Sequence, residues 1–186
     1  MSLAHAILGM LTYQPMTGYD LKTLCFDGSI SHFWEADQAQ IYRTLDKLTE
    51  QGMVESEIEY QDTRPNRKIY HLTLAGRAML DEWLQTTQPL PTRREAFLIQ
   101  VFFGYRLTDD ETTALIHQQI QMHRDLLEHY HQIPLPQFDD PAMTREQMYN
   151  RFTLDLGIRN EEMYIAWLET CLTRIKSLQT TTPTSP

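Results

Sequence analysis

Near the start of the chain, apolar residues recur at helical spacing in three short segments. The first segment ends before Pro15, because proline disfavours helical dihedral angles in the residue that precedes it. The third segment follows Asp37, which can cap a helix together with Gln40, and ends at Gly52, which suits a left-handed C-terminal cap. The apolar positions are Leu3, Ile7, Met10 and Leu11, then Leu21, Leu24 and Cys25, then Ile41, Leu45 and Leu48, with Phe33 and Trp34 as further expected core residues. The pattern predicts three amphipathic helices.

After the third helix, the hydrophobic period changes from about 3.6 residues to 2. Val54, Ile58 and Tyr60 alternate with glutamates, which predicts a half-buried strand, and residues 69–74 predict a second strand beyond a polar turn. Thr73 can cap a fourth helix over residues 74–84, whose expected inward residues are Met79, Leu80, Trp83 and Leu84. Two strands directly after a helix-turn-helix predict a winged helix-turn-helix domain, residues 1–84.

Residues 85–92 carry two prolines and no periodic pattern, which predicts a linker. Beyond it the pattern is helical: residues 93–105, a helix from Thr108 to about residue 130, and a helix from Thr144 to about residue 178, bent or interrupted at Gly157. Thr108 and Thr144 each begin a capping-box pattern. Residues 179–186 predict a disordered tail. The predicted fold class is therefore mainly α, with a C-terminal helical dimerisation domain at residues 93–178.

Two heptad-like patterns in the C-terminal half give the grounds for a dimer. Apolar residues repeat at intervals of four and three over about two heptads in each of two helices. The candidate dimerisation residues are Ile116, Ile120, Leu127, Tyr164, Leu168, Cys171, Ile175 and Leu178. Two heptads are too few to establish a long coiled coil, so the same spacing fits a helix pair within one subunit or a seam between two.

Charge limits the classes of partner. The 186-residue chain has a formal net charge of −9, with 7 basic and 12 acidic side chains in residues 1–84 and 9 and 13 in residues 85–186. This excludes a histone-like binder of nucleic acid but leaves room for a local basic patch. Cys25 and Cys171 form no CxxC pair, the first residues lack a charged leader, and no apolar run approaches the roughly 18 residues of a membrane span. We expect a cytoplasmic protein without a membrane partner.

The third predicted helix is a candidate reading helix for DNA. Its outer face carries Arg43 and Lys47, and Gln40 and Tyr42 lie on the flanks. Gln40 and Arg43 can contact adenine and guanine in the major groove, and Tyr42 and Lys47 can contact phosphate. An ordinary amphipathic helix with a solvated face has the same pattern, and Gln40 could serve wholly as a capping residue.

A basic turn follows between the two predicted strands. Arg64, Asn66, Arg67 and Lys68 lie at the expected apex of the hairpin, where a winged helix contacts phosphate or the minor groove. Surface hairpins also carry charge for solubility. The order of helix, turn, amphipathic helix, glycine, strand, basic tip and strand favours the DNA-binding interpretation.

Motifs spread over the N-terminal domain carry a family resemblance. They are LGML at 8–11, TGYDL at 17–21, Phe33 and Trp34, QIYRTL at 40–45, Leu48, GMV at 52–54, the RPNRK tip with Tyr70, and LTLAG at 72–76. Together they resemble the PadR family of bacterial transcriptional regulators. The stretch YNRFTLDLGIRNEEMYIAWLETCL at 149–172 is similar to the helical domain of PadR members related to the virulence-gene activator AphA.

The resemblance implies a homodimer that binds a two-fold-related DNA operator, usually as a repressor. It places residues 40–47 in the major groove, with the wing beside it, and Tyr42 at an aromatic position that usually contacts the DNA backbone. The acidic residues Asp37, Asp46 and Glu50 lie on or beside this face and limit the contact area. The family also includes sensors of phenolic acids and drugs.

Other functions find less support in the residues. Four histidines at 117, 123, 129 and 131 lack the spacing of metal ligands on a helix, so we expect no metal or other cofactor. Motifs of nucleophilic or phosphate-binding enzymes are absent, so we expect no enzymatic activity. Phe97, Phe102, Phe103 and Tyr105, with Tyr164 and Trp167, form either a pocket for a small aromatic effector or simply core. The alternative function is a winged-helix protein–protein interaction module without DNA binding.

Overall fold

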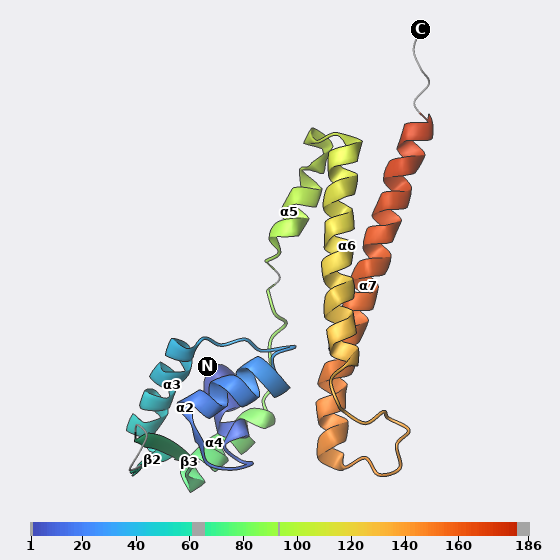
Figure 1. The fold of residues 1–186 in the computed structure, drawn as a ribbon. Coiled ribbons are helices and arrows are strands. Elements are labelled where there is room, and N and C mark those ends of the chain that lie inside the picture. The colour runs from blue at the N-terminus through green and yellow to red at the C-terminus, as the bar shows by residue number, and fades with distance from the viewer. Residues whose placement is uncertain (1, 61–65, 93, 182–186) are drawn as a thin grey trace. The chain divides into compact units, whose positions relative to one another are not determined.

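The computed structural model describes residues 2–60, 66–92 and 94–181, the last four by their backbone only. The chain divides into two compact units between Leu90 and Pro91, within the segment expected to be a linker. The residue limits that the sequence predicts for each domain remain predictions. Figure 1 shows the elements of both units, and each unit is described separately below.

The first unit is a small helical bundle with a three-stranded antiparallel sheet. Its elements are α1 (Ser2–Met10), β1 (Met16–Thr17), α2 (Gly18–Asp20), a π-helix η1 (Leu21–Ser29), α3 (Gln38–Glu50), β2 (Val54–Glu59), β3 (Arg67–Leu72) and α4 (Leu74–Leu84). The sheet has the order β1-β3-β2, with Met16 opposite Tyr70 and Val54 opposite Leu72. The helix-turn-helix and the hairpin of the predicted winged helix are therefore present.

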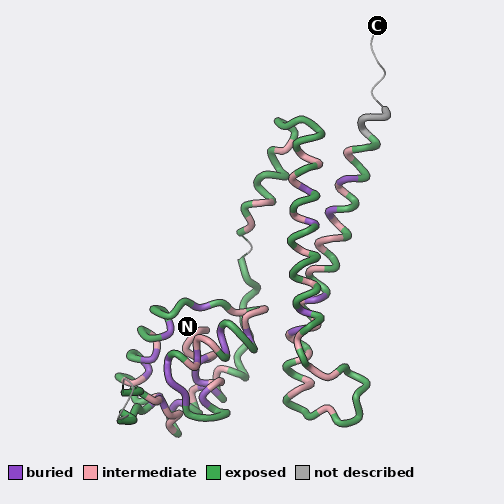
Figure 2. Tube along the Cα trace, viewed as in Figure 1, coloured by how far each residue is buried: buried purple, intermediate pink, exposed green. Residues whose placement is uncertain are grey.

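A single apolar core holds this unit together. Ile7, Leu8, Leu21, Ile41 and Leu45 are completely buried in it. Figure 2 shows how the buried positions recur along the helices of the unit. At roughly 1.5–3 kcal/mol for each fully buried large apolar side chain, such a core dominates the stability of a domain of this size. The predicted stripe of the third helix is confirmed.

The turn after α3 is fixed to the start of α4. Gly52 has φ +70°, as expected of a left-handed C-terminal cap. The hydroxyl of Thr73 lies 2.9 Å from the carbonyl oxygen of Met53 and accepts a 3.0 Å hydrogen bond from the amide of Gly76, which confirms Thr73 as the cap of α4. A Cβ at Gly76 would lie 2.0 Å from the Met53 oxygen, so only glycine fits there. This junction sets where α3 ends relative to β2.

Several predictions about this unit are wrong. The second strand begins at Arg67 and ends at Leu72, and the two-residue strand β1 was not predicted. Five residues expected inside are exposed: Leu24, Phe33, Ile58, Tyr60 and Leu84. Only the first residue of β2 is buried, and β2 is an edge strand of the sheet. Trp34, by contrast, is half-buried and packs on the core.

All the regular elements among the described residues of the second unit are helical, and residues 132–144 form a loop between α6 and α7. It comprises α5 (Ala96–Phe102), a 3-10 turn η2 (Gly104–Arg106), α6 (Asp109–His131) and α7 (Arg145–Thr181). Thr108 with Glu111 forms a capping box at α6, and Thr144 with Gln147 forms one at α7, both as predicted. Helix α5 is shorter than predicted, and α7 continues through Gly157 without a break, with the ring of Tyr130 against that glycine.

Helices α6 and α7 pack along each other within one chain. One cluster contains Ile116, Ile120, Leu168 and Leu172, and a second contains Tyr130, Leu154 and Ile158. Between them, the imidazole of His123 stacks on Tyr164 with ring centroids 4.4 Å apart and bonds to Glu161 through Nδ1. The Tyr164 hydroxyl donates to Glu95, which joins the segment before α5 to α7.

Candidate nucleic-acid interface

Helix α3 begins at a complete capping box. The Asp37 carboxylate accepts a 2.7 Å hydrogen bond from the amide of Gln40, and Gln40 Oε1 accepts one of 3.3 Å from the amide of Asp37. Both bonds match the prediction from the sequence. The second bond uses the carbonyl of the Gln40 side chain and holds that side chain at the first turn of the helix.

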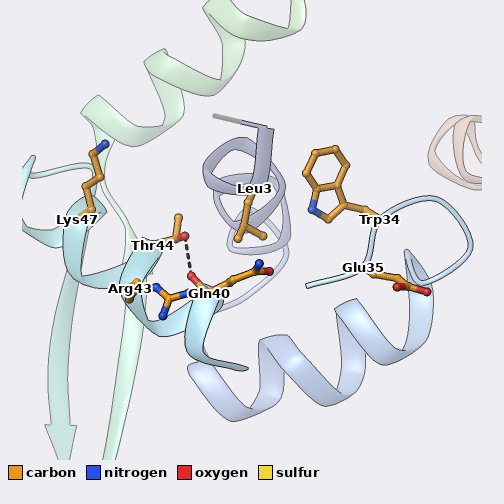
Figure 3. A pocket seen from close by; sticks show the side chains of 7 residues that line it. All are labelled: Leu3, Trp34, Glu35, Gln40, Arg43, Thr44 and Lys47. Carbon is orange, nitrogen blue, oxygen red and sulfur yellow. Dashed lines mark hydrogen bonds between the residues drawn. The ribbon is translucent and has the colours of Figure 1, made fainter. Parts of the chain in front are cut away.

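The outer face of α3 lines a groove of about 540 Å³. Figure 3 shows Gln40, Arg43, Thr44 and Lys47 following one another along α3. Across the groove lie three residues from other parts of the same unit: Leu3 from α1, and Trp34 and Glu35 from the segment after η1. The structure thus brings three of the predicted DNA-binding residues onto one open surface. Thr44 and Trp34, which were not predicted to take part, share it.

Two cations in this groove are available to an anion. Arg43 and Lys47 are exposed and form no ion pair with any residue that the structure describes. An exposed guanidinium on a helix surface can contact guanine through two hydrogen bonds, and an ammonium can contact a phosphate as a point charge. The groove therefore combines the side-chain amide of Gln40 at the start of α3 with the guanidinium of Arg43 and the ammonium of Lys47 further along the same helix.

Tyr42 lies on the flank of α3, against α2. A Cβ placed on Gly18 would be 2.6 Å from Tyr42 Cε1 and 2.7 Å from Cζ, so the ring rests directly on the glycine. The side chain is still about 37% exposed. The absence of a side chain at Gly18 thereby lets the phenol ring lie directly against α2 at the surface of the helix-turn-helix.

The basic residues of the wing are already engaged by carboxylates. Arg67 Nη2 donates a 3.0 Å hydrogen bond to Asp20 Oδ2, and Arg67 Nη1 lies 3.7 Å from Glu59. Lys68 Nζ lies 3.9 Å from Asp46 and 5.1 Å from the ring centroid of Tyr70. Asn66 is exposed beside them, and Arg64 lies outside the described residues. The wing and the helix-turn-helix are therefore connected by ion pairs that the sequence did not predict.

Asp20 occupies the centre of this connection. Thr17 caps α2, and Asp20 Oδ2 accepts hydrogen bonds from the amide and the hydroxyl of Thr17, at 3.1 and 2.7 Å. Burial opposes ionisation of this carboxyl, but the Thr17 hydrogen bonds and the Arg67 charge outweigh it and lower the pKa of Asp20. The Thr-x-x-Asp spacing at residues 17–20 is the capping-box signal from which this could have been found.

The predicted dimerisation residues pack inside one chain. Ile116, Ile120 and Leu168 are buried between α6 and α7, where Tyr164, Cys171 and Ile175 also pack, and Leu127 packs on the second cluster. The side chain of Leu178 lies outside the described residues. Of the two interpretations that the spacing allowed, these contacts belong to the pair within a subunit.

A different apolar surface is left open on α5. This helix has no buried residue, and its large apolar residues are exposed by more than a third: Leu98, Ile99, Val101 and Phe102, with Phe103 directly after it. Phe102, Phe103 and Tyr105 are therefore exposed and do not enclose a pocket among the described residues of this unit. Phe97 is the exception, because it packs edge-on against Trp167 with ring centroids 6.4 Å apart.

The part of the chain that the structure describes offers neither a metal site nor a membrane-spanning helix. Within residues 2–60, 66–92 and 94–181, no three His, Cys, Asp or Glu side chains gather as a possible metal site. We also found no helix in those ranges with the length and hydrophobicity of a transmembrane span.

The chain matches two families of regulators. Residues 7–82 match the transcriptional regulator PadR-like family, and residues 93–176 match the family of the virulence activator alpha C-terminal domain. The negative transcriptional regulator PadR of Bacillus subtilis is 30% identical over 178 residues, which cover 93% of this chain and 97% of that protein. This chain belongs to the PadR-like family of transcriptional regulators.

Solved structures of two other regulators share the fold. Bacillus subtilis PadR in complex with operator DNA gives a TM-score of 0.83 at 30% identity, over 94% of this chain and 99% of that one. The same protein in complex with p-coumaric acid gives 0.74 at 30% identity, over 95% and 99%. The Vibrio cholerae virulence activator AphA gives 0.75 at 29% identity, over 95% and 99%. The predicted mainly α fold with an N-terminal winged helix is confirmed.

Proposed function

We propose that this PadR-like regulator binds a two-fold-related DNA operator as a homodimer and represses transcription from it. The observation that carries the proposal is the open groove of α3, where Gln40, Arg43 and Lys47 lie together on a capped, well-packed helix. Repression is supported by the PadR relative, which is a negative regulator. Operator binding is supported by the structure of that relative with operator DNA.

Within this proposal, α3 lies in the major groove. Arg43 contacts the edge of a guanine, and Gln40 contacts an adenine through its amide N–H groups while its carbonyl, which has two lone pairs, still accepts from the cap. Tyr42 and Lys47 contact phosphates, and Arg64, Asn66, Arg67 and Lys68 contact the backbone beside the wing. Because Arg67 and Lys68 are ion-paired in the free protein, they add less net positive charge to the wing than their number suggests.

The proposed dimer uses the apolar surface of α5. A stretch of five exposed large apolar residues, Leu98, Ile99, Val101, Phe102 and Phe103, is more than a monomeric protein ordinarily leaves in water. Since the α6–α7 heptads are used within the subunit, α5 is the better-supported site of contact between two copies. A dimer also duplicates the small basic groove, as a two-fold-related operator requires.

The reading helix is tested by one pair of substitutions. Arg43→Ala should weaken operator binding by about 1–3 kcal/mol, because it removes a contact to a base edge. Arg77→Ala is the matched control, since it removes the same charge from an exposed position on α4. The measurement is a quantitative gel shift on duplexes that the wild-type protein selects from a random pool. Equal binding by both variants would refute the role of Arg43.

The remaining assignments follow from this mode of action. The protein acts by binding and not by catalysis, and it works in the cytoplasm, where its DNA is. A small aromatic acid as effector is supported by the relative that was solved with p-coumaric acid.

One observation favours the alternative of a protein–protein module: both described wing cations, Arg67 and Lys68, already face carboxylates. If the wild-type protein binds no duplex at low salt but retains a protein partner in pull-downs, that alternative replaces the proposal.

A further inference from the structure

Arg67 is held in place by a chain of contacts that begins in the helix-turn-helix. The Asp20 carboxylate accepts three hydrogen bonds at Oδ2: from the Thr17 amide, the Thr17 hydroxyl and Arg67 Nη2. The first two keep Asp20 fixed relative to α2. Only about 27% of the Asp20 side chain is exposed, so this carboxylate is largely screened by its own partners.

The backbone repeats the same connection. Thr17 pairs with Ile69 in the sheet, two residues beyond Arg67 on β3. The capping residue of α2 is therefore also paired with the wing stem, which is the part of β3 that joins the wing to the sheet. On the other side of Arg67, Nη1 lies 3.7 Å from Glu59 of β2. The guanidinium is thereby placed between the helix-turn-helix and the wing, at the point where the two meet.

We propose that Asp20 is a positioning residue for operator binding: by fixing the Arg67 guanidinium and the wing stem against α2, it orients the wing for contact with the DNA backbone. This rests on the proposed function. Arg67 has five N–H donors, and Asp20 takes one of them, so others remain for a phosphate. A side chain that is already ordered loses less conformational entropy on binding. The lowered pKa of Asp20 keeps the carboxylate ionised at neutral pH.

If Asp20 merely repels DNA, its neutralisation should strengthen binding, because one negative charge near the DNA backbone would disappear. The two ideas therefore predict opposite signs for the same substitution. This makes the charge of Asp20 directly testable.

The experiment is a double-mutant cycle on operator affinity. Four proteins are compared, wild type, Asp20→Asn, Arg67→Ala and the double variant, on a duplex that the wild-type protein selected from a random pool. Asparagine preserves an acceptor for the Thr17 cap and removes the charge that holds Arg67. We expect Asp20→Asn to weaken binding roughly 3- to 10-fold in the wild-type background and less than about 2-fold in the Arg67→Ala background, because coupled residues are non-additive.

Two further variants separate positioning from folding and from bulk charge. Asp20→Glu retains both charge and capping ability and should keep affinity within about 2-fold of wild type. Asp81→Asn, on the exposed surface of α4, makes the same charge change and should leave affinity unaltered. Thermal unfolding of every variant shows which of them are folded at the binding temperature.

The outcomes are distinguishable. If the wild-type protein binds no duplex, the proposed function fails and this proposal falls with it. If wild type binds but Asp20→Asn loses the same affinity in both backgrounds, Asp20 has a merely structural role. Tighter binding by Asp20→Asn would show repulsion, and either result would overturn the positioning role alone.

Discussion

Gly18 and Tyr42 illustrate how a single residue can control a proposed DNA contact. Gly18→Ala would place a methyl group within 2.6 Å of the Tyr42 ring. Because the clash is with the end of a partly exposed side chain, the ring should swing away at little cost to stability. We expect operator affinity to fall by about 1 kcal/mol, roughly five-fold, since the phenol loses its hydrogen bond to phosphate.

The control for this change is Gly9→Ala. An added Cβ at Gly9, inside α1, meets nothing within 4 Å. Alanine is favoured over glycine in a helix by roughly 0.5–1 kcal/mol, so this variant should be slightly more stable and bind normally. Filter binding together with thermal unfolding measures both quantities. If Gly18→Ala binds as tightly as Gly9→Ala, the orientation of Tyr42 is irrelevant to DNA binding.

Asp20 also predicts a pH dependence of stability. Its folded-state pKa is below the ordinary value of 3.8, so its stabilising effect is fully present above that value. The effect is lost as the pH falls through the folded-state pKa, where the carboxyl becomes protonated in both states. Urea unfolding of wild type and Asp20→Asn should therefore differ at pH 7 and converge in strong acid. A difference that persists unchanged in acid would show that the carboxylate charge is not involved.

At the scale of single residues, contacts between residues close together in the sequence could be predicted. Contacts between residues far apart in the sequence could not. The capping boxes at Asp37, Thr108 and Thr144 involve residues three apart, so their spacing alone reveals them. The Arg67–Asp20 pair spans 47 positions and depends on how β1 joins β3. For the same reason, the carboxylate partners of Arg67 and Lys68 could not be predicted from the sequence, and the role of the basic tip in binding DNA remains a prediction.

At the scale of elements, the buried interface between α6 and α7 should determine stability, and the exposed surface of α5 should determine assembly. Leu168 is completely buried in this interface. Leu168→Ala should therefore cost about 2–5 kcal/mol of the free energy of unfolding, through lost burial and a cavity. Urea denaturation followed by circular dichroism measures this. A cost below about 1 kcal/mol would mean that the helix pair is not packed as described here.

Helix α5 should instead control assembly. Replacing Ile99 and Phe102 by alanine removes two exposed apolar side chains and should shift the protein towards monomer while the helical signal is retained. Sedimentation equilibrium over a range of concentrations tests this. A variant that remains as dimeric as wild type would place the subunit contact on another surface.

Helices and strands could be predicted where their hydrophobic pattern extends over many residues. Helices α3 and α6 have complete amphipathic patterns and caps, and both were found with nearly correct limits. Strand β1 is only two residues, which is too short for a sequence period to reveal it. The apolar spacing did predict a helix in the segment of η1, but it could not show that this helix is a π-helix interrupted by the non-helical dihedrals of Gly28. The heptads predicted contact faces correctly, but spacing does not distinguish contacts within a subunit from contacts between subunits.

For the whole molecule, the acidic charge and the DNA-binding role are compatible. A net charge of −9 leaves few sites for phosphate, and the described wing cations are partly neutralised within the protein. Few phosphate contacts imply a shallow dependence on salt, with a slope of about −0.9 in log affinity against log salt concentration for each contact. Under the proposed function, specificity then depends on Arg43 and Gln40 and on duplication of the groove by dimerisation.

The most direct test of this account is selection of operator DNA from a pool of random duplexes by the wild-type protein. We predict enrichment of a two-fold-related pair of half-sites, with centres about one helical turn or a multiple of it apart, and loss of that enrichment with Arg43→Ala. Failure to enrich any sequence, or enrichment of a single asymmetric site that Arg43→Ala selects equally well, would contradict it.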